Sequence, residues 1–79
     1  MKTYIEILHR ADGEKASVIF ELLSDMGLKP ALGENDFVYD WKENVPLSVV
    51  ISFLDRVLSK LKDTGAILKF TTIRWLLIA

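Results

Sequence analysis

Residues 46–64 read PLSVVISFLDRVLSKLKDT, and their apolar side chains recur at steps of three and four residues. At 3.6 residues per turn, this spacing places them on one stripe of a helix. The stripe consists of Leu47, Val50, Leu54, Val57, Leu58 and Leu61. Asn44 is expected to cap this helix, Pro46 to lie in its first turn and Gly65 to end it. Because such a stripe needs an apolar surface to cover, we expect the rest of the chain to supply a sheet and a second helix.

Size and hydrophobicity indicate one small domain that associates with itself. The chain has 79 residues, which allows only a thin hydrophobic core. Hydrophobic residues make up 51% of the sequence and charged residues 27%. This composition is too apolar for a disordered chain, and it favours either an efficient core or apolar surface hidden in an oligomer. We therefore predict a single domain over residues 1–79 that forms a homo-oligomer, most simply a dimer.

Composition and charge exclude several kinds of chemistry. The chain has no cysteine, which excludes disulfides, thiolate metal sites and cysteine nucleophiles, and its one histidine argues against a histidine zinc site. The serines of the predicted helices have no base within helical reach, so we predict no catalytic residue, no metal site and no cofactor. The net charge of −1 provides no broad positive field for nucleic acid.

The sequence also favours the cytoplasm over a membrane. The first ten residues, MKTYIEILHR, carry Glu6, His9 and Arg10 where a signal peptide needs an apolar run. The longest apolar run is the tail at residues 75–79, far shorter than the roughly 20 residues that span a bilayer. We therefore expect a cytoplasmic protein that does not enter a membrane.

The N-terminal part of the chain predicts a strand followed by a helix. Residues 3–9 alternate in the manner of a strand, so that Ile5 and Ile7 share one face. Asp12 is expected to cap the helix that follows, and Gly27 to close it in the left-handed conformation. The apolar stripe of this helix consists of Ala16, Ile19, Phe20, Leu23 and Met26.

The middle and the end of the chain predict three more strands around the long helix. Residues 28–32 are short, and Pro30 confines them to an edge or an irregular strand. Residues 33–36 read GEND, a turn by composition, and lead into the strong strand FVYDW at residues 37–41. The last strand is ILKFTTI at residues 67–73.

The order of elements is strand, helix, strand, strand, helix, strand. It predicts an α+β, two-layer ferredoxin-like sandwich, in which both helices cover one face of an antiparallel sheet and the first and third strands lie in the middle. The opposite face of the sheet is then open to a partner. Its expected side chains are Tyr4, Glu6, Leu8, Val38, Asp40, Lys69, Thr71 and Ile73.

Phe37, Tyr39 and Trp41 share one face of the third strand, and placing them in the core avoids burying Asp40. The alternative is a base-stacking platform of the RNA-recognition type that uses Tyr4 and this aromatic set. Acidic flanking residues and the negative net charge favour the core interpretation. Binding of single-stranded RNA on the open face is therefore kept as the alternative function.

The apolar tail, WLLIA at residues 75–79, is costly to leave in water. It could extend the last strand within the monomer, contact another subunit, or form a disordered appendage. We favour a contact between subunits that the open sheet face and the tail share. The predicted contact residues are Tyr4, Leu8, Val38, Trp75, Leu76 and Leu77.

A small-ligand site is predicted where the first strand meets the first helix. Arg10, Asp12 and Gly13 lie there, and backbone amides at a helix N-terminus can hold a phosphate or a carboxylate. The alternative is an ordinary strand-end loop with a helix cap, and the lack of a glycine-rich pattern favours that alternative.

The segment DGEKASVIFELLSDMGLKP at residues 12–30 resembles the loop, helix and strand of ACT-type regulatory domains. Gly13 lies at the helix start and Met26, Gly27 and Leu28 at its end, although Asp12 stands where those domains usually have proline. The resemblance implies a small domain that dimerises and binds an effector, such as an amino acid, near the strand-to-helix loop. The leading hypothesis is thus a non-catalytic domain that acts by self-association and binds a small ligand or a protein partner.

Overall fold

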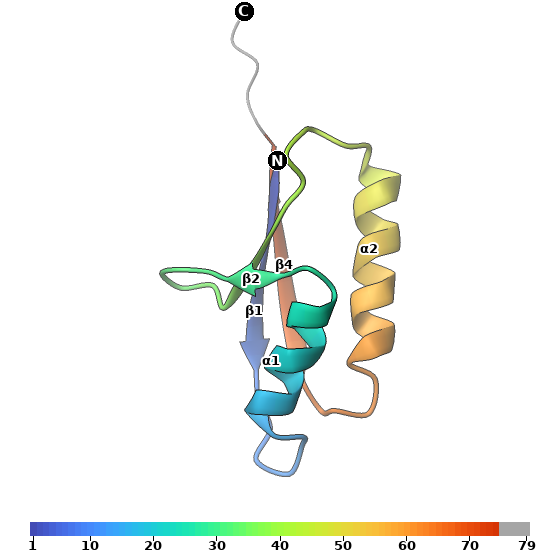
Figure 1. The fold of residues 1–79 in the computed structure, drawn as a ribbon. Coiled ribbons are helices and arrows are strands. Elements are labelled where there is room, and N and C mark those ends of the chain that lie inside the picture. Colours follow the sequence, from blue (N-terminus) through green and yellow to red (C-terminus); the bar gives the residue numbers. More distant parts are fainter. Residues whose placement is uncertain (75–79) are drawn as a thin grey trace, which may run out of the picture.

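The computed structural model describes residues 1–74, which form two helices on one face of a four-stranded antiparallel sheet (Figure 1). The strand order is β2-β3-β1-β4, so that β1 and β3 lie in the middle of the sheet. This arrangement confirms the two-layer sandwich predicted from the order of elements. The elements are β1 (Lys2–Leu8), α1 (Ala16–Asp25), β2 (Lys29–Pro30), β3 (Phe37–Asp40), α2 (Leu47–Lys60) and β4 (Ile67–Ile73).

The alternation along β1 separates the two faces of the sheet. Ile5 and Ile7 are buried in the core cluster beneath the helices, whereas Tyr4 and Glu6 are half-buried on the other face. Ile5 lies opposite Phe37 on β3 and opposite Phe70 on β4, so apolar side chains continue across the three strands. Alternation of this kind fixes the register, because a shift by one residue would exchange the faces.

The aromatic side chains of β3, together with Trp41 directly after it, belong to the core, as predicted. Phe37 is 1% exposed, and Tyr39 and Trp41 pack against the core cluster. The Tyr39 and Trp41 rings lie 4.5 and 5.3 Å from the ring of Phe53 on α2. The indole Nε1 of Trp41 donates a hydrogen bond of 2.9 Å to Oγ1 of the buried Thr3, so the indole N–H has a partner inside the core.

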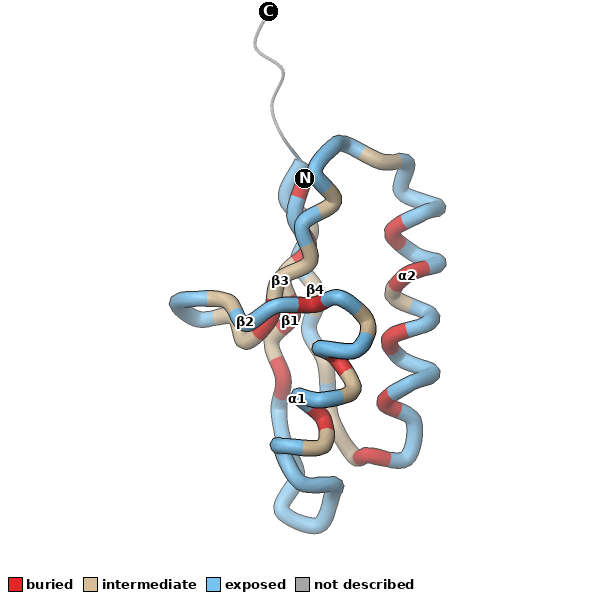
Figure 2. The backbone as a smooth tube through the Cα atoms, in the orientation of Figure 1, coloured by how far each residue is buried: buried red, intermediate tan, exposed pale blue. Residues whose placement is uncertain are grey.

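The predicted core stripe of α2 is partly wrong. The buried positions are Val50, Phe53 and Val57, and Figure 2 shows the buried, red segments of α2 on the side that faces the sheet. Leu47 and Leu58, which the sequence placed in the stripe, are 61% and 50% exposed. Relative to the predicted orientation, the helix is turned about its axis so that Phe53 faces the sheet, because this large ring packs against Tyr39 and Trp41.

Neither helix has the N-cap that the sequence predicted. The capping position of α1 is Lys15 and that of α2 is Pro46, and neither makes a side-chain capping hydrogen bond. The cap predicted at Asp12 is wrong because α1 begins at Ala16, and the cap predicted at Asn44 is wrong because α2 begins at Leu47.

The C-terminus of α1 ends as predicted, at Gly27. This glycine has φ of 89°, and the amide of Leu28 donates to the carbonyl of Leu23 at 3.2 Å. The pattern is that of a Schellman motif, which satisfies a carbonyl at the end of the helix and returns the chain to the sheet.

Asp36 joins the turn before β3 to the middle of β1. Its Oδ2 accepts a hydrogen bond of 2.8 Å from the amide of Ile7, and its own amide donates to the carbonyl of Ile5 at 2.9 Å. The carboxylate therefore continues the pairing of β1 past the first residue of β3.

None of the helices in residues 1–74 is long and apolar enough to cross a membrane.

Candidate functional site

The loop that was expected to hold an anion is closed on itself. Arg10 donates from Nε and Nη2 to the two carboxylate oxygens of Asp12, each at 3.2 Å, and both side chains are largely exposed. The charges of this pair neutralise each other, and α1 begins only at Ala16, four residues after Asp12. The structure thus brings Arg10 and Asp12 together, as one another's partners.

Gly13 has a packing role in the same loop. A Cβ atom on Gly13 would lie 2.6 Å from the carbonyl oxygen of Thr64, which precedes β4. The amide of Glu14 donates to that same oxygen at 2.8 Å, and Gly65 also lies against Gly13. Residues 10–14 therefore dock on the connection between α2 and β4, and only glycine fits at the contact.

The open face of the sheet has charges in its middle and apolar side chains toward β4. Lys69 lies opposite Glu6 in the register between β4 and β1, in the cross-strand position predicted for it. By contrast, Leu8, Ile67 and Ile73 are 60%, 57% and 55% exposed. Of the predicted contact residues on this face, Leu8 is exposed, whereas Tyr4 and Val38 are half-buried.

A second apolar surface lies on α2 and was missed in the sequence. Leu47, Ile51 and Leu58 are 61%, 48% and 50% exposed, and the half-buried Leu54 lies between them along the helix. Their spacing of four, three and four residues is itself that of a helix stripe. The signal is present in the sequence, because α2 carries two adjoining apolar stripes, and the single predicted stripe combined residues of both. We call Leu47, Ile51, Leu54 and Leu58 the outer stripe.

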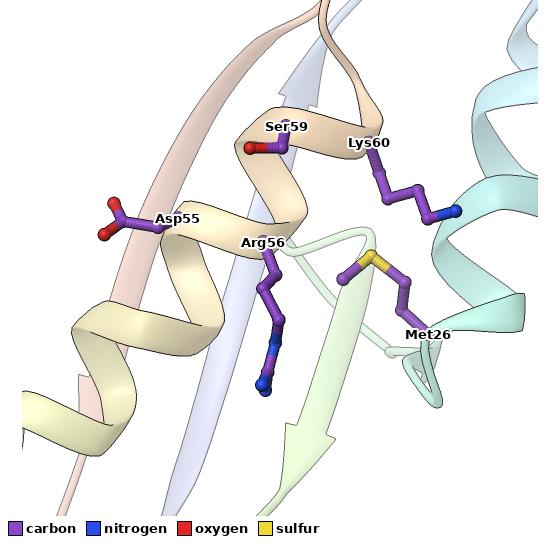
Figure 3. Close-up of a pocket in the computed structure, with 5 residues that line it drawn as sticks. All are labelled: Met26, Asp55, Arg56, Ser59 and Lys60. Atoms are coloured by element: carbon purple, nitrogen blue, oxygen red, sulfur yellow. The ribbon is translucent and has the colours of Figure 1, made fainter.

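A hollow of ≈ 400 Å³ lies between α2 and the end of α1 and is shown in Figure 3. Lys60 and Met26 line it, and Figure 3 shows Asp55 pointing away from α1. The guanidinium of Arg56 lies over the ring of Phe53 at 5.7 Å and helps to cover the core. The hollow therefore identifies the flank of α2 that faces α1, opposite the outer stripe.

Another hollow, of ≈ 500 Å³, lies beside β2 and β3 and is lined in part by Lys2, Lys29 and Lys42. Asp40 lies among these lysines and accepts a hydrogen bond of 2.8 Å from the amide of Lys42. Burial lowers the pKa of the Met1 amino group, and the nearby Asp40 carboxylate partly offsets this effect. The positive charge around the hollow is thus partly compensated.

The remaining predictions concern metals and the tail. Among residues 1–74, His, Asp and Glu side chains do not gather in groups of three that could hold a metal ion. The predicted contact residues Trp75, Leu76 and Leu77 lie outside the described residues.

Comparison of the chain with protein-family models, with curated proteins and with solved structures finds no match. The fold and its surfaces define a small α+β sandwich in which most of the exposed large apolar side chains of residues 1–74 lie on α2, on β4 or at the end of β1. These surfaces are therefore the features of the molecule that bear on its function.

Proposed function

We propose that this protein is a non-catalytic cytoplasmic domain that acts by self-association and, in the associated form, binds a small ligand or a protein partner. The observation that carries the proposal is the position of the exposed apolar side chains. Of the nine exposed large hydrophobic side chains in residues 1–74, three lie on the outer stripe of α2 and three on β4 or the neighbouring end of β1. Single exposed hydrophobic residues are ordinary, but a gathered set marks a contact surface.

The oligomeric state tests this proposal. We expect sedimentation velocity of the full chain to show a dimer that dissociates on dilution through the micromolar range. A species that sediments as a monomer at all concentrations up to several hundred micromolar would refute self-association. Small-ligand binding at Arg10, Asp12 and Gly13 stays a separate prediction, which is checked by the shift in thermal stability with amino acids and nucleotides.

Binding of single-stranded RNA remains the alternative, with less support. In the strands of the described sheet, Tyr4 is the only aromatic side chain on the open face, because Phe37, Tyr39 and Phe70 point toward the helices. A stacking platform needs several exposed rings. The alternative would be supported by salt-sensitive binding of single strands that is lost in Tyr4→Ala.

A further inference from the structure

We propose that two copies of this chain pair through their β4 strands across a twofold axis, which joins two four-stranded sheets into one and packs the outer stripe of each α2 on that of the other. This inference rests on the proposed self-association and names its surface. It differs from the sequence prediction, in which the open face and the tail made the contact.

The two edges of the sheet differ in a way that points to β4. The edge strand β2 has only two residues, Lys29 and Pro30, and a proline and a lysine both discourage pairing with another chain. The edge strand β4 has seven residues without proline, and all seven pair with β1 in an unbroken register. Within residues 1–74, β4 has a neighbouring strand on one side only. Its other side offers free backbone amides and carbonyls to an added strand.

The sequence of β4 is complementary to itself about Phe70. In an antiparallel pair centred on Phe70, Ile67 lies opposite the partner's Ile73, and Lys69 lies opposite the partner's Thr71. Both isoleucines are more than half exposed in the single chain. A pair centred on Lys69 would instead place two lysines opposite each other, which is unfavourable. The charge pattern therefore favours the register centred on Phe70 over the one centred on Lys69.

A hollow at the end of the sheet fits the same register. It measures ≈ 220 Å³ and is lined by Leu8 and Ile67, together with Glu6, Leu68 and Lys69. In the pair centred on Phe70, the partner's Ile73 lies beside this hollow, and the twofold axis repeats the contact at the other end. Two apolar contacts thus frame the paired strands.

The helix layer is matched to the same pairing. Met26, Arg56 and Lys60 mark the flank of α2 that faces α1, and Figure 3 shows β4, in pale red, as the strand farthest from α1. At 3.6 residues per turn, the exposed outer stripe, with Leu47, Ile51 and Leu58, lies on the opposite flank of the helix. Packed helices lie about 10 Å apart, which is about twice the spacing of strands. A sheet that continues through β4 places the partner's α2 beside this flank, where the outer stripes of the two copies can meet.

The area is sufficient for a weak specific dimer. A strand of seven residues is about 24 Å long, and a sheet with its helix layer is roughly 20 Å thick. Each copy would then contribute about 500 Å², for a total of about 1,000 Å², which is near the lower limit for a specific interface. We expect a dissociation constant in the micromolar range.

Charge rescue tests the pairing. Ile67→Lys and Ile73→Glu should each raise the dissociation constant of the dimer at least tenfold in sedimentation equilibrium. Each variant places a charged side chain against the partner's isoleucine, and the twofold axis repeats this contact at both ends of the paired strands. The double variant should recover most of the loss, since each introduced lysine then faces an introduced glutamate across the axis. Within one chain these positions lie at opposite ends of β4, so recovery cannot arise inside the monomer. Leu32→Lys, at a 99% exposed position outside this surface, is the matched control and should leave the dimer unchanged.

Disulfide trapping tests the register directly, because the natural chain has no cysteine. Lys69→Cys and Thr71→Cys should form a cross-linked dimer when the two variants are mixed and oxidised. Each variant alone should form much less, since equal positions lie on a diagonal that is too long for a disulfide. A cross-link in Lys69→Cys alone would overturn the register.

Loss of this inference can be distinguished from loss of the proposed function. A dimer that keeps its affinity in Ile67→Lys and is abolished by Val38→Lys uses the middle of the open face. Self-association would then stand, and the β4 pairing would fall. A chain that is monomeric under all conditions would overturn both.

Discussion

Replacing Phe53 with alanine should destabilise the fold more than any other single truncation on α2. Its side chain is 3% exposed and lies against the rings of Tyr39 and Trp41, with Arg56 covering its outer face. The truncation would leave a cavity between the helix and the aromatic residues of β3, which are too large to move into it without breaking their own contacts.

The magnitude follows from this environment. Truncation of a buried phenylalanine costs about 3–5 kcal/mol, and the ring contacts and the cation–π contact place Phe53 at the upper end of that range. A domain of 79 residues has a total stability of about 4–12 kcal/mol. Phe53→Ala is therefore expected to be marginally folded, whereas Phe53→Leu should lose about 1–2 kcal/mol and remain folded.

Urea unfolding followed by far-UV circular dichroism measures these losses. Low protein concentration keeps dissociation of an oligomer out of the result. Leu58→Ala is the matched control, because Leu58 is 50% exposed and should lose less than about 1 kcal/mol in the monomer. If Leu58→Ala cost about 3 kcal/mol and Phe53→Leu nothing, the helix would face the sheet with the stripe first predicted, and our description of the core would be refuted.

Three further predictions concern the loops. Gly13→Ala should lose about 1–3 kcal/mol in urea unfolding, since its Cβ would lie 2.6 Å from the Thr64 carbonyl oxygen, and an effect below 0.5 kcal/mol would contradict the docking of this loop. Asp12→Ala, one residue earlier, should change stability by less than about 1 kcal/mol because its ion pair is exposed, and a larger loss would show that the pair contributes to the fold. Asp36→Ala should lose about 1–3 kcal/mol by removing the acceptor of the Ile7 amide, with the exposed Glu34→Ala as its control, and equal losses in the two variants would contradict this role.

The sequence predicted the architecture because each element has a clear local pattern. The strand predicted over residues 67–73 agrees with β4, since the segment is rich in β-branched and aromatic residues and Gly65 comes shortly before it. Gly27 predicted the end of α1 for a similar reason, because the left-handed conformation there is a local requirement. Pro30 predicted an edge strand, and β2 lies at an edge.

The failures arose where a distant part of the chain decides the outcome. Asp12 has the right residue type for a cap. However, the amide of Glu14 donates to the carbonyl of Thr64, which holds this loop on the connection before β4, and α1 begins only at Ala16. On α2, periodicity alone cannot tell which of two apolar stripes faces the sheet. The aromatic residues of β3 decide in favour of Phe53, and this leaves Leu47, Ile51 and Leu58 outside. The candidate contact surface was hidden in the sequence for the same reason.

The place of β1 in the sheet has a consequence for synthesis. The earliest strand lies between β3 and β4, and Thr3 forms a hydrogen bond of 2.9 Å with Thr72, 69 residues later. A ribosome therefore has to release nearly all of the described chain before β1 has a neighbour on both sides. Until then, one edge of the emerging sheet stays open to other nascent chains, so a pause in translation ahead of β4 should favour aggregation.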